Sequence, residues 1–308
     1  MSEECNNKIG MLYLSATPIG NLEDMTYRSV RILGEADLIA AEDTRHSRKL
    51  LSHFDIHTPL TSYHEHNKLE KGPELVEKML AGDTIVCISD AGLPGISDPG
   101  AHLAMLAIEA GINVSPLPGA NAALSALICS GLDTTAFTFY GFLPRTGKKR
   151  RELLERIKQS PETLIFYEAP HHLKGTLSDL IKALGPQRRA VTARELTKTF
   201  EEFNRRTLGE LAGYYDEHDP KGEFVIIIEG FDAENEVAAE PEQQLSPVEM
   251  VAGLEAEGMG HKDAMRETAK KLGISRRDVY QALLNTSSTA LTEPASHCSG
   301  PPSPEGKA

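Results

Sequence analysis

The stretch TIVCISDAGLPGISDPG, residues 84–100, decides how this chain folds. Its first five residues are apolar and β-rich, and an alanine-rich helical pattern follows Gly100, so the stretch predicts a strand, a loop and a helix in succession. Glycine permits positive φ and proline fixes φ near the values of helix entry, while Asp90 and Asp98 offer hydrogen-bond acceptors. Open α/β sheets bind their ligands in loops at the carboxyl ends of strands. We therefore expect an α/β fold with a polar ligand at this loop.

A simpler interpretation makes the loop a plain connection, in which Asp98 caps the helix and Pro99 occupies its first position. That interpretation accounts for these two residues alone. It does not explain the four turn-forming residues spread between Gly92 and Gly100, because such connections usually need only a few residues in all. A binding role is the stronger interpretation.

Size and composition indicate an ordinary globular protein with more than one unit. A chain of 308 residues, 40% hydrophobic and 25% charged, predicts two or three compact units. The four cysteines are far apart and form no CxxC pair, which predicts no metal or redox motif and fits the reducing cytoplasm. The polar start Met1–Lys8 and the lack of a long apolar run predict neither a signal peptide nor a membrane span.

The first half of the chain alternates between strand and helix patterns, and this alternation predicts a mostly parallel sheet with helices on both faces, over residues 1–133. Strands are expected at Met11–Thr17, Asp37–Ala41, Pro59–Tyr63, Thr84–Asp90 and Asn113–Pro118, and helices at Met25–Leu33, His46–His53, Leu69–Ala81, Ala101–Ala110 and Ala120–Ser130.

The second half changes character. Its last two to three strands have little predicted helix between them, which favours a mixed sheet in a separate α+β domain, residues 134–231. The expected strands are Phe137–Phe142, Thr163–Tyr167, Arg189–Glu195, Phe200–Thr207 and Phe224–Glu229, and the expected helices are Lys148–Gln159 and His172–Leu184.

Beyond these domains we predict an acidic linker (232–245), an all-helical module (246–286) and a disordered tail (287–308). The module has the helix, short glycine turn and serine-capped second helix of a helix-turn-helix. Because lysines and arginines crowd that turn, Arg276 and Arg277 are candidate nucleic-acid contacts. A plain packing or dimerisation module has the same spacing and remains an alternative.

Ionisable residues cluster after the second and third predicted strands. Glu42, Arg45 and His46 exceed what helix capping requires, so they are candidates for acid/base work or anion binding. His64 and His66 have the spacing of two metal ligands, but no third histidine or cysteine lies nearby, so we predict no metal.

The strongest basic run is Arg145–Arg151, in a chain whose net charge of −13 excludes indiscriminate coating of nucleic acid. Its cations oppose the dipole at a predicted helix start, which makes a phosphate-backbone contact more plausible than a solvated helix face. The predicted contacts in the run are Arg145, Lys148, Lys149, Arg150 and Arg151.

Five short strings together resemble the tetrapyrrole methylase-like family, over about residues 10–230. They are TPIGNLED (17–24), AEDTR (41–45), the loop SDAGLPGISDPG (89–100), PGA (118–120) and FYEAPH (166–171). Relatives that methylate corrinoid or sirohaem precursors carry a GxGPGD-like first loop, whereas this chain has TPIGN, which points to the RNA-methylating branch.

The resemblance implies two α/β domains of tetrapyrrole methylase type with the cofactor cleft between them; the small C-terminal helical module predicted above lies beyond the residues that the resemblance covers. It implies S-adenosylmethionine as the cofactor and a homodimer as the assembly. The residues that it places at the cofactor are Ile19, Asp90, Leu93, Asn121, Ala122, Glu168, Ala169, Gly222 and Glu223.

The implied reaction is transfer of the sulfonium methyl group to the ribose 2′-hydroxyl of a cytidine in 16S ribosomal RNA of the small subunit. Such a transfer needs orientation of the two reactants and a base for the hydroxyl proton. From side-chain chemistry alone, Glu42 or His64 is the candidate base, and Arg45 and Arg145 are candidate phosphate contacts. Two alternatives stay open: a small-molecule tetrapyrrole methylase, and a non-enzymatic DNA-binding regulator that uses the helix-turn-helix.

Overall fold

The computed structural model describes residues 9–232 except 97, and residues 246–289 except 257 and 273. Internal contacts divide the chain into two units, Met1–Phe231 and Asp232–Ala308, which are described separately. Residues 233–245 of the predicted linker and residues 290–308 of the predicted tail lie outside the described residues.

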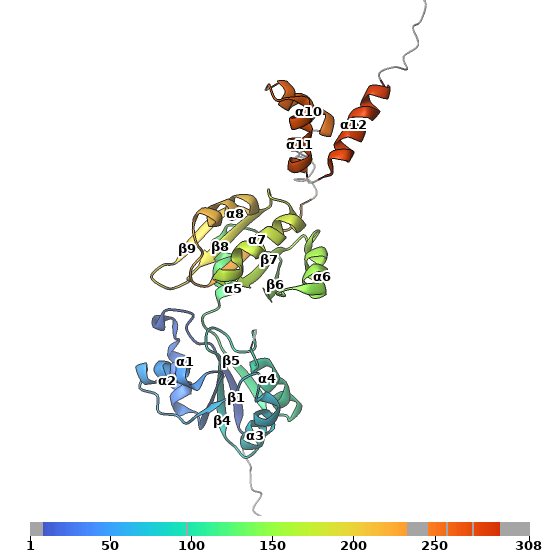
Figure 1. The fold of residues 1–308 in the computed structure, drawn as a ribbon. Coiled ribbons are helices and arrows are strands. Elements are labelled where there is room, and N and C mark those ends of the chain that lie inside the picture. The colour runs from blue at the N-terminus through green and yellow to red at the C-terminus, as the bar shows by residue number, and fades with distance from the viewer. Residues whose placement is uncertain (1–8, 97, 233–245, 257, 273, 290–308) are drawn as a thin grey trace, which may run out of the picture. The chain divides into compact units, whose positions relative to one another are not determined.

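The first sheet is five-stranded and entirely parallel, as the alternating pattern predicts (Figure 1). Its strand order is β3-β2-β4-β1-β5. The strands are β1 (Met11–Ser15), β2 (Leu38–Ala41), β3 (Leu60–Ser62), β4 (Thr84–Ile88) and β5 (Asn113–Leu117).

Both faces of this sheet are covered, which is why β4 reads as a continuous apolar run. Ile85 and Cys87 pack on one face with α3 and α4, and Val86 and Ile88 pack on the other with α1 and α2. The bounds of these helices are α1 (Tyr27–Glu35), α2 (Thr44–His53), α3 (Lys68–Leu80) and α4 (Gly100–Glu109), with a 3-10 turn, η1 (Leu22–Asp24), before α1.

The second sheet is mixed, which confirms that part of the prediction. In the order β6-β7-β10-β8-β9, the neighbours β6 and β7 are parallel and the other three neighbouring pairs are antiparallel. Its strands are β6 (Phe137–Phe142), β7 (Thr163–Glu168), β8 (Arg189–Arg194), β9 (Glu202–Thr207) and β10 (Phe224–Ile228). One face packs on α6 (Gly147–Ile157), α7 (Pro170–Leu184) and α8 (Leu208–Glu217).

Helix α8 corrects the expectation of little helix between the last strands. A capping box begins it: the Thr207 hydroxyl accepts from the Glu210 N–H, and the Glu210 carboxylate accepts from the Thr207 N–H. The spacing Thr-x-x-Glu was the available signal, but its threonine is also the last residue of β9, so the strand pattern concealed the start of the helix.

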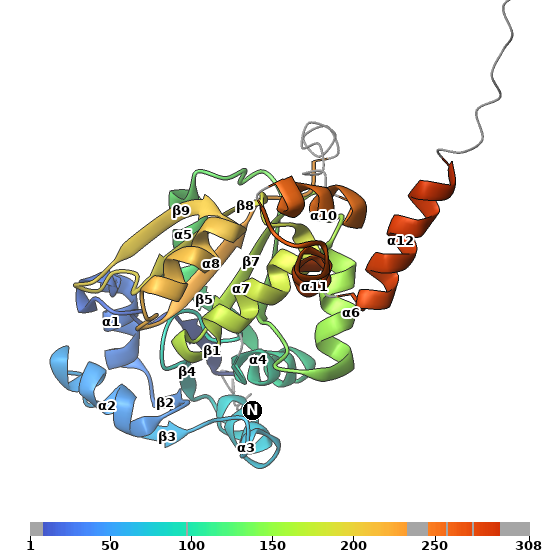
Figure 2. The ribbon, with the colours of Figure 1, turned by 45° about the horizontal axis from the view of Figure 1, so that its top comes forward.

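Helix α5 (Ala122–Ser130) follows β5 of the first sheet but packs on the second sheet, beside β7, β8 and β10 (Figures 1 and 2). Ala123, Ala126 and Leu127 form a core there with Val225 and Ile227 of β10. The connection between β5 and α5 therefore joins the two sheets, whereas the boundary predicted at 133/134 lies after this helix.

The second unit contains three helices in its described part, α10 (Pro247–Ala256), α11 (His261–Leu272) and α12 (Arg276–Thr289). Ser246 and Ser275 cap α10 and α12, accepting from the N–H groups of Glu249 and Asp278 at 3.2 Å each. The last helix continues past the predicted end of the module at 286. Across the described residues of both units, none of the helices has the length and apolarity of a membrane span.

Candidate functional site

Backbone groups tie the loop between Ser89 and Gly100 to the connection after β1. Thr17 and Gly92 exchange two backbone hydrogen bonds, of 2.9 and 3.0 Å, which pair the loop with the connection after β1. Gly92 and Gly95 have φ of 82° and 94°, the left-handed region in which glycine carries no steric cost. The turn residues that the sequence singled out therefore give this loop its shape.

The two aspartates of the loop do different work. Asp98 Oδ1 accepts from the N–H groups of Gly95 and Gly100, at 2.8 Å each, so this carboxylate closes the loop and caps the start of α4. The simpler interpretation is right that Asp98 bonds the start of α4, but Pro99 occupies the N-cap position and not the first position of the helix, which is Gly100. Asp90 Oδ1 accepts from the Asp43 N–H at 3.0 Å, which ties the loop to the connection after β2.

A cavity of about 530 Å³ opens beside this loop, and residues of both sheets line it. On the first sheet the walls are the connections after β1, β2, β4 and β5, all at the carboxyl ends of parallel strands, where such folds hold ligands. On the second sheet they come from the ends of β6, β7 and β8, the segment after β8, and the start of β10. Nine residues proposed from the sequence line the cavity: Ile19, Glu42, Asp90, Leu93, Asn121, Ala122, Glu168, Ala169 and Glu223.

The ionisable groups of the cavity wall are mostly acidic. They comprise the carboxylates of Glu42, Asp90, Asp98, Glu168 and Glu223 and the ammonium group of Lys198. Lys198 Nζ is itself paired, at 2.9 Å from Glu195 Oε1 and 2.8 Å from Glu223 Oε2. Apolar side chains complete the wall, so the cavity suits a ligand with cationic groups on a partly apolar body.

Glu42 is the carboxylate whose protonation the site perturbs. Burial and the nearby negative charge of Asp90 raise the pKa of Glu42 above its ordinary value. A Glu42 oxygen lies 3.5 Å from the Asp90 backbone nitrogen. A half-buried carboxylate with a raised pKa is suited to accept a proton near neutral pH.

The other candidate base and the first candidate phosphate contact lie outside the cavity wall. His64 is not a lining residue, and its buried Nδ1 has no hydrogen-bond partner among the described residues. Arg45 is exposed and already binds Asp43 through Nη2 at 2.8 Å and Nε at 3.2 Å. That guanidinium holds the pKa of the Asp43 carboxyl far below its usual range.

Two more of the proposed cofactor residues have clear structural roles. Asn121 caps α5, since its Oδ1 accepts from the Leu124 N–H at 2.9 Å. Gly222 has φ of 84°, and a Cβ there would lie 2.5 Å from the Glu195 side chain. This glycine precedes Glu223, whose N–H donates to Glu195 Oε1 at 2.9 Å.

Sequence reasoning missed the segment after β8, from which Leu196 and Lys198 reach the cavity. Glu195 and Thr197 have positive φ of 49° and 64°, an uncommon conformation for residues other than glycine. The segment Glu195–Lys198 contains no glycine, asparagine or proline that would predict such a turn, so nothing in the sequence indicated it.

A second cavity, of about 910 Å³, shares Phe142, Glu168 and Ala169 with the first. It lies along α6 and α7, and Arg145, His171 and Lys182 are among its lining residues. These three shared residues, Glu168 among them, form a common wall between the two cavities.

The basic run divides in the structure. Arg145 and Arg151 are exposed and, within the described part of the chain, have no ion-pair partner; the same holds for Lys149. Lys148 lies 3.5 Å from Glu152. Arg150 instead turns inward, and its Nε lies 2.9 Å from Asp179 Oδ2.

Arg276 and Arg277 are exposed at the start of α12, as the predicted role requires. No group of three or more His, Cys, Asp or Glu side chains is arranged to hold a metal ion anywhere in the described ranges.

Comparison with known proteins identifies the class first. The family model of the tetrapyrrole (corrin/porphyrin) methylases matches residues 11–212. The fold agrees: a uroporphyrin-III C-methyl transferase from Thermus thermophilus, solved in complex with S-adenyl homocysteine, aligns with a TM-score of 0.52 at 18% identity, over 71% of this chain and 97% of that one. The protein therefore has the tetrapyrrole methylase fold.

Sequence relatives narrow the class. The ribosomal RNA small subunit methyltransferase I of Halalkalibacterium halodurans is 53% identical over 88% of this chain and 93% of that protein. The protein of the same name from Bacillus subtilis is 47% identical over 92% of this chain and 97% of its own length. The chain belongs to the ribosomal RNA small subunit methyltransferase I family.

Proposed function

We propose that this chain transfers a methyl group from S-adenosylmethionine to the ribose 2′-hydroxyl of a cytidine in 16S ribosomal RNA of the small subunit. The family membership supports this reaction. The observation that carries it is the pair of cavities: an acidic one formed by both sheets, and a larger one with the exposed Arg145 in its wall, which share Glu168.

The residues of the smaller cavity fit the proposed cofactor. Its volume of about 530 Å³ is in the range of pockets for molecules of this size. Its carboxylates complement the sulfonium and ammonium groups, and Ile19, Leu93 and Tyr167 offer apolar surface to the remainder. When bound, S-adenosylmethionine supplies an electrophilic methyl group.

In this proposal Asp90 and the backbone around Leu93 hold the cofactor from the first sheet. Asn121 and Ala122 approach it from the start of α5. From the second sheet, Glu168, Ala169 and Glu223 complete the cavity, and Gly222 fixes the backbone before Glu223. Fixing the reactants in line is the main contribution that such a site makes to the rate.

Glu42 is the proposed base. It lines the cavity and His64 does not, which favours Glu42 between the two candidates. As its ionised carboxylate, Glu42 accepts the proton of the ribose hydroxyl while the new carbon–oxygen bond forms. The raised pKa strengthens this carboxylate as a base at neutral pH.

The exposed cations near the larger cavity are the proposed RNA contacts. Arg145 lies in its wall, and Lys149 and Arg151 are on the same helix, α6, with Lys148. Arg45 near the first cavity and Arg276 and Arg277 on α12 are further contacts in this proposal. A local patch of this kind lets an acidic protein dock on one place of an RNA particle.

Two further expectations come from the family resemblance. We propose that the protein works as a homodimer and that it acts in the cytoplasm, where small ribosomal subunits are found.

The reaction is tested with tritiated S-adenosylmethionine and three acceptors: small ribosomal subunits, naked 16S RNA and sirohaem precursors. We expect label on ribose in the subunits. After alkaline hydrolysis the label should remain in a dinucleotide, because a methylated 2′-oxygen cannot attack the neighbouring phosphate. Label in the sirohaem precursors, or none with any acceptor, would overturn the proposal.

A further inference from the structure

Arg150 differs from every other cation of the basic run in its surroundings. Its side chain is 12% exposed, whereas that of Lys148, two residues earlier, is 82% exposed. A guanidinium that is this buried must have its donors satisfied within the protein, because leaving them unpaired costs free energy.

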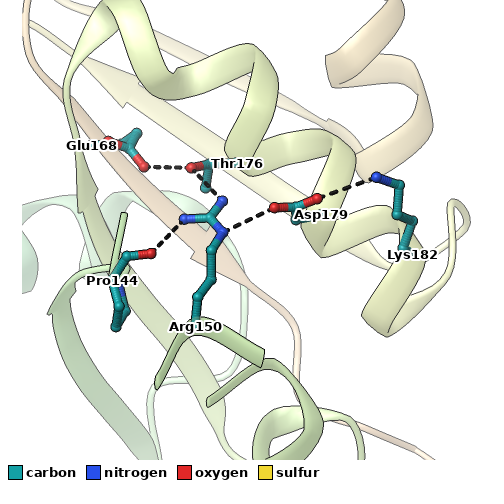
Figure 3. Close-up of polar contacts among 6 residues, drawn as sticks. All are labelled: Pro144, Arg150, Glu168, Thr176, Asp179 and Lys182. Carbon is teal, nitrogen blue, oxygen red and sulfur yellow. Dashed lines mark hydrogen bonds and ion pairs between the residues drawn. The ribbon is translucent and has the colours of Figure 1, made fainter. Parts of the chain in front are cut away.

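The structure satisfies three of those donors (Figure 3). Arg150 Nε donates to Asp179 Oδ2 at 2.9 Å and Nη1 donates to the Pro144 carbonyl at 2.9 Å. Nη2 donates to the Thr176 hydroxyl at 3.2 Å. Arg150, which lies on α6, is thus bonded both to the connection between β6 and α6 and to helix α7.

These contacts fix the direction of the next hydrogen bond. A guanidinium only donates, so Thr176 Oγ1 is the acceptor toward Arg150, and its single proton is left for Glu168 Oε2 at 2.6 Å. The other oxygen of Glu168 accepts from the Ala169 N–H at 2.9 Å. Thr176 and Glu168 are both buried, and each carboxylate oxygen of Glu168 therefore has a defined partner.

Glu168 is the residue at which this chain of hydrogen bonds reaches the two cavities, since it lines both. We propose that Arg150 is a positioning residue: through Thr176 it holds the Glu168 carboxylate at the common wall, and it does not contact RNA. The meaning of that wall for methyl transfer rests on the function proposed above, but the effect on the cofactor cavity does not.

Loss of Arg150 leaves the Thr176 hydroxyl without its donor and free to rotate away from Glu168. The carboxylate then loses its fixed orientation in the wall of the smaller cavity. Displacements of about 1 Å in a reacting site cost on the order of a hundredfold in rate. We expect the larger part of the damage in turnover and a smaller part in ligand affinity.

The test compares Arg150→Met with Arg151→Met, an exposed neighbour on the same helix, in the full-length protein. The first readout is the affinity for S-adenosylhomocysteine by calorimetry, without RNA. We expect Arg150→Met to weaken it about tenfold, as expected for a lost hydrogen-bond network to a charged group, and Arg151→Met to leave it within about twofold.

The second readout is binding to small subunits across salt concentrations. Arg151→Met should weaken binding and reduce the salt slope by about one, as loss of one phosphate contact does. Arg150→Met should bind the subunit as the unchanged protein does, with the same slope, while single-turnover methylation falls on the order of a hundredfold.

Two further variants separate positioning from folding. Thr176→Val removes the hydroxyl at nearly constant volume and should reproduce the Arg150→Met losses, whereas Thr176→Ser keeps the hydroxyl and should restore both affinity and turnover. Lys182→Met removes only the exposed outer ion pair to Asp179 and should change cofactor affinity by no more than about twofold. Circular dichroism and thermal unfolding confirm that each variant is folded.

The inference is overturned if Arg150→Met keeps full affinity for S-adenosylhomocysteine and shows a reduced salt slope in subunit binding. It is also overturned if Thr176→Ser loses as much affinity and turnover as Thr176→Val. Failure of the proposed function looks different. In that case the unchanged protein methylates no RNA, and the calorimetric comparison of Arg150→Met, Thr176→Val and Thr176→Ser still decides the role of Arg150.

Discussion

The two walls of the smaller cavity are built by different means. On the first sheet the carboxylates are held by backbone N–H groups of adjacent connections: Asp90 by Asp43, and Asp98 by Gly95 and Gly100. On the second sheet one oxygen of Glu168 accepts from the Ala169 N–H, and the other is held by a side chain, the Thr176 hydroxyl, which in turn accepts from Arg150 on α6.

This difference shows which groups fix the positions of the carboxylates in each wall. The donors to Asp98 belong to the loop itself and the donor to Asp90 belongs to the connection after β2, so the first wall uses backbone groups and requires no particular side chain as a donor. The second wall needs a side chain on α6 to meet two side chains on α7, and any of the three can be lost without changing the loop. The first wall should therefore tolerate distant substitutions, and the second should not.

The largest expected effect lies in the first wall, at Glu42. Glu42→Gln removes the proposed base and should lower methyl transfer on the order of a hundredfold or more. In the unchanged protein, activity should fall as the pH falls through the raised pKa of Glu42, because the base must be ionised. A pH series of single-turnover rates checks this. If the rate of Glu42→Gln still falls at low pH in the same way, the titrating group is not Glu42.

The same raised pKa has a stability consequence of known sign. Because the folded state favours protonated Glu42, the stabilisation from Glu42 is fully present below the unfolded pKa and is lost as the pH rises through the folded value. Glu42→Gln should therefore raise the melting temperature at pH 8 relative to the unchanged protein. The gain should shrink at pH 4, and thermal unfolding at both pH values measures it.

Asp90→Ala comes next in size and tests whether the first wall binds the cofactor. Removing the carboxylate should weaken S-adenosylhomocysteine binding by about ten- to a hundredfold, the range for a hydrogen bond to a charged group. Asp98→Ala is the matched comparison: it should lower thermal stability, since two loop N–H groups lose their acceptor. Calorimetry measures cofactor affinity and thermal stability in both variants. Full affinity in a folded Asp90→Ala would mean that the loop is a plain connection and does not bind the cofactor.

The smallest effect is expected in the second wall, at Lys198. Its ion pairs with Glu195 and Glu223 are only partly buried, so Lys198→Met should change cofactor affinity by no more than a few-fold. If Lys198→Met instead exceeds Arg150→Met in its effect on affinity, the second wall depends on this ion pair and not on the hydrogen bonds through Thr176.

The two walls also differ in how far the sequence could predict them. The strands and turns around Asp90 follow from short-range patterns, and β1, β2, β4 and β5 fall within the expected ranges. Helix α8 was hidden because its capping box begins at the last residue of β9. The inward turn of Arg150 was not predictable, because its partners Thr176 and Asp179 are far along the chain and a run of cations gives no sign of which one is buried.

Helix α5 has a consequence for how the chain folds during its synthesis. Ala123, Ala126 and Leu127 leave the ribosome together with the first sheet, but their partners Val225 and Ile227 follow about a hundred residues later. At about 5–20 residues per second this is a delay of roughly 5–20 s. Strands β7 and β8, which also pack on α5, are synthesised earlier, but through that interval the part of the apolar face of α5 that packs on β10 stays uncovered while the first sheet can already be complete.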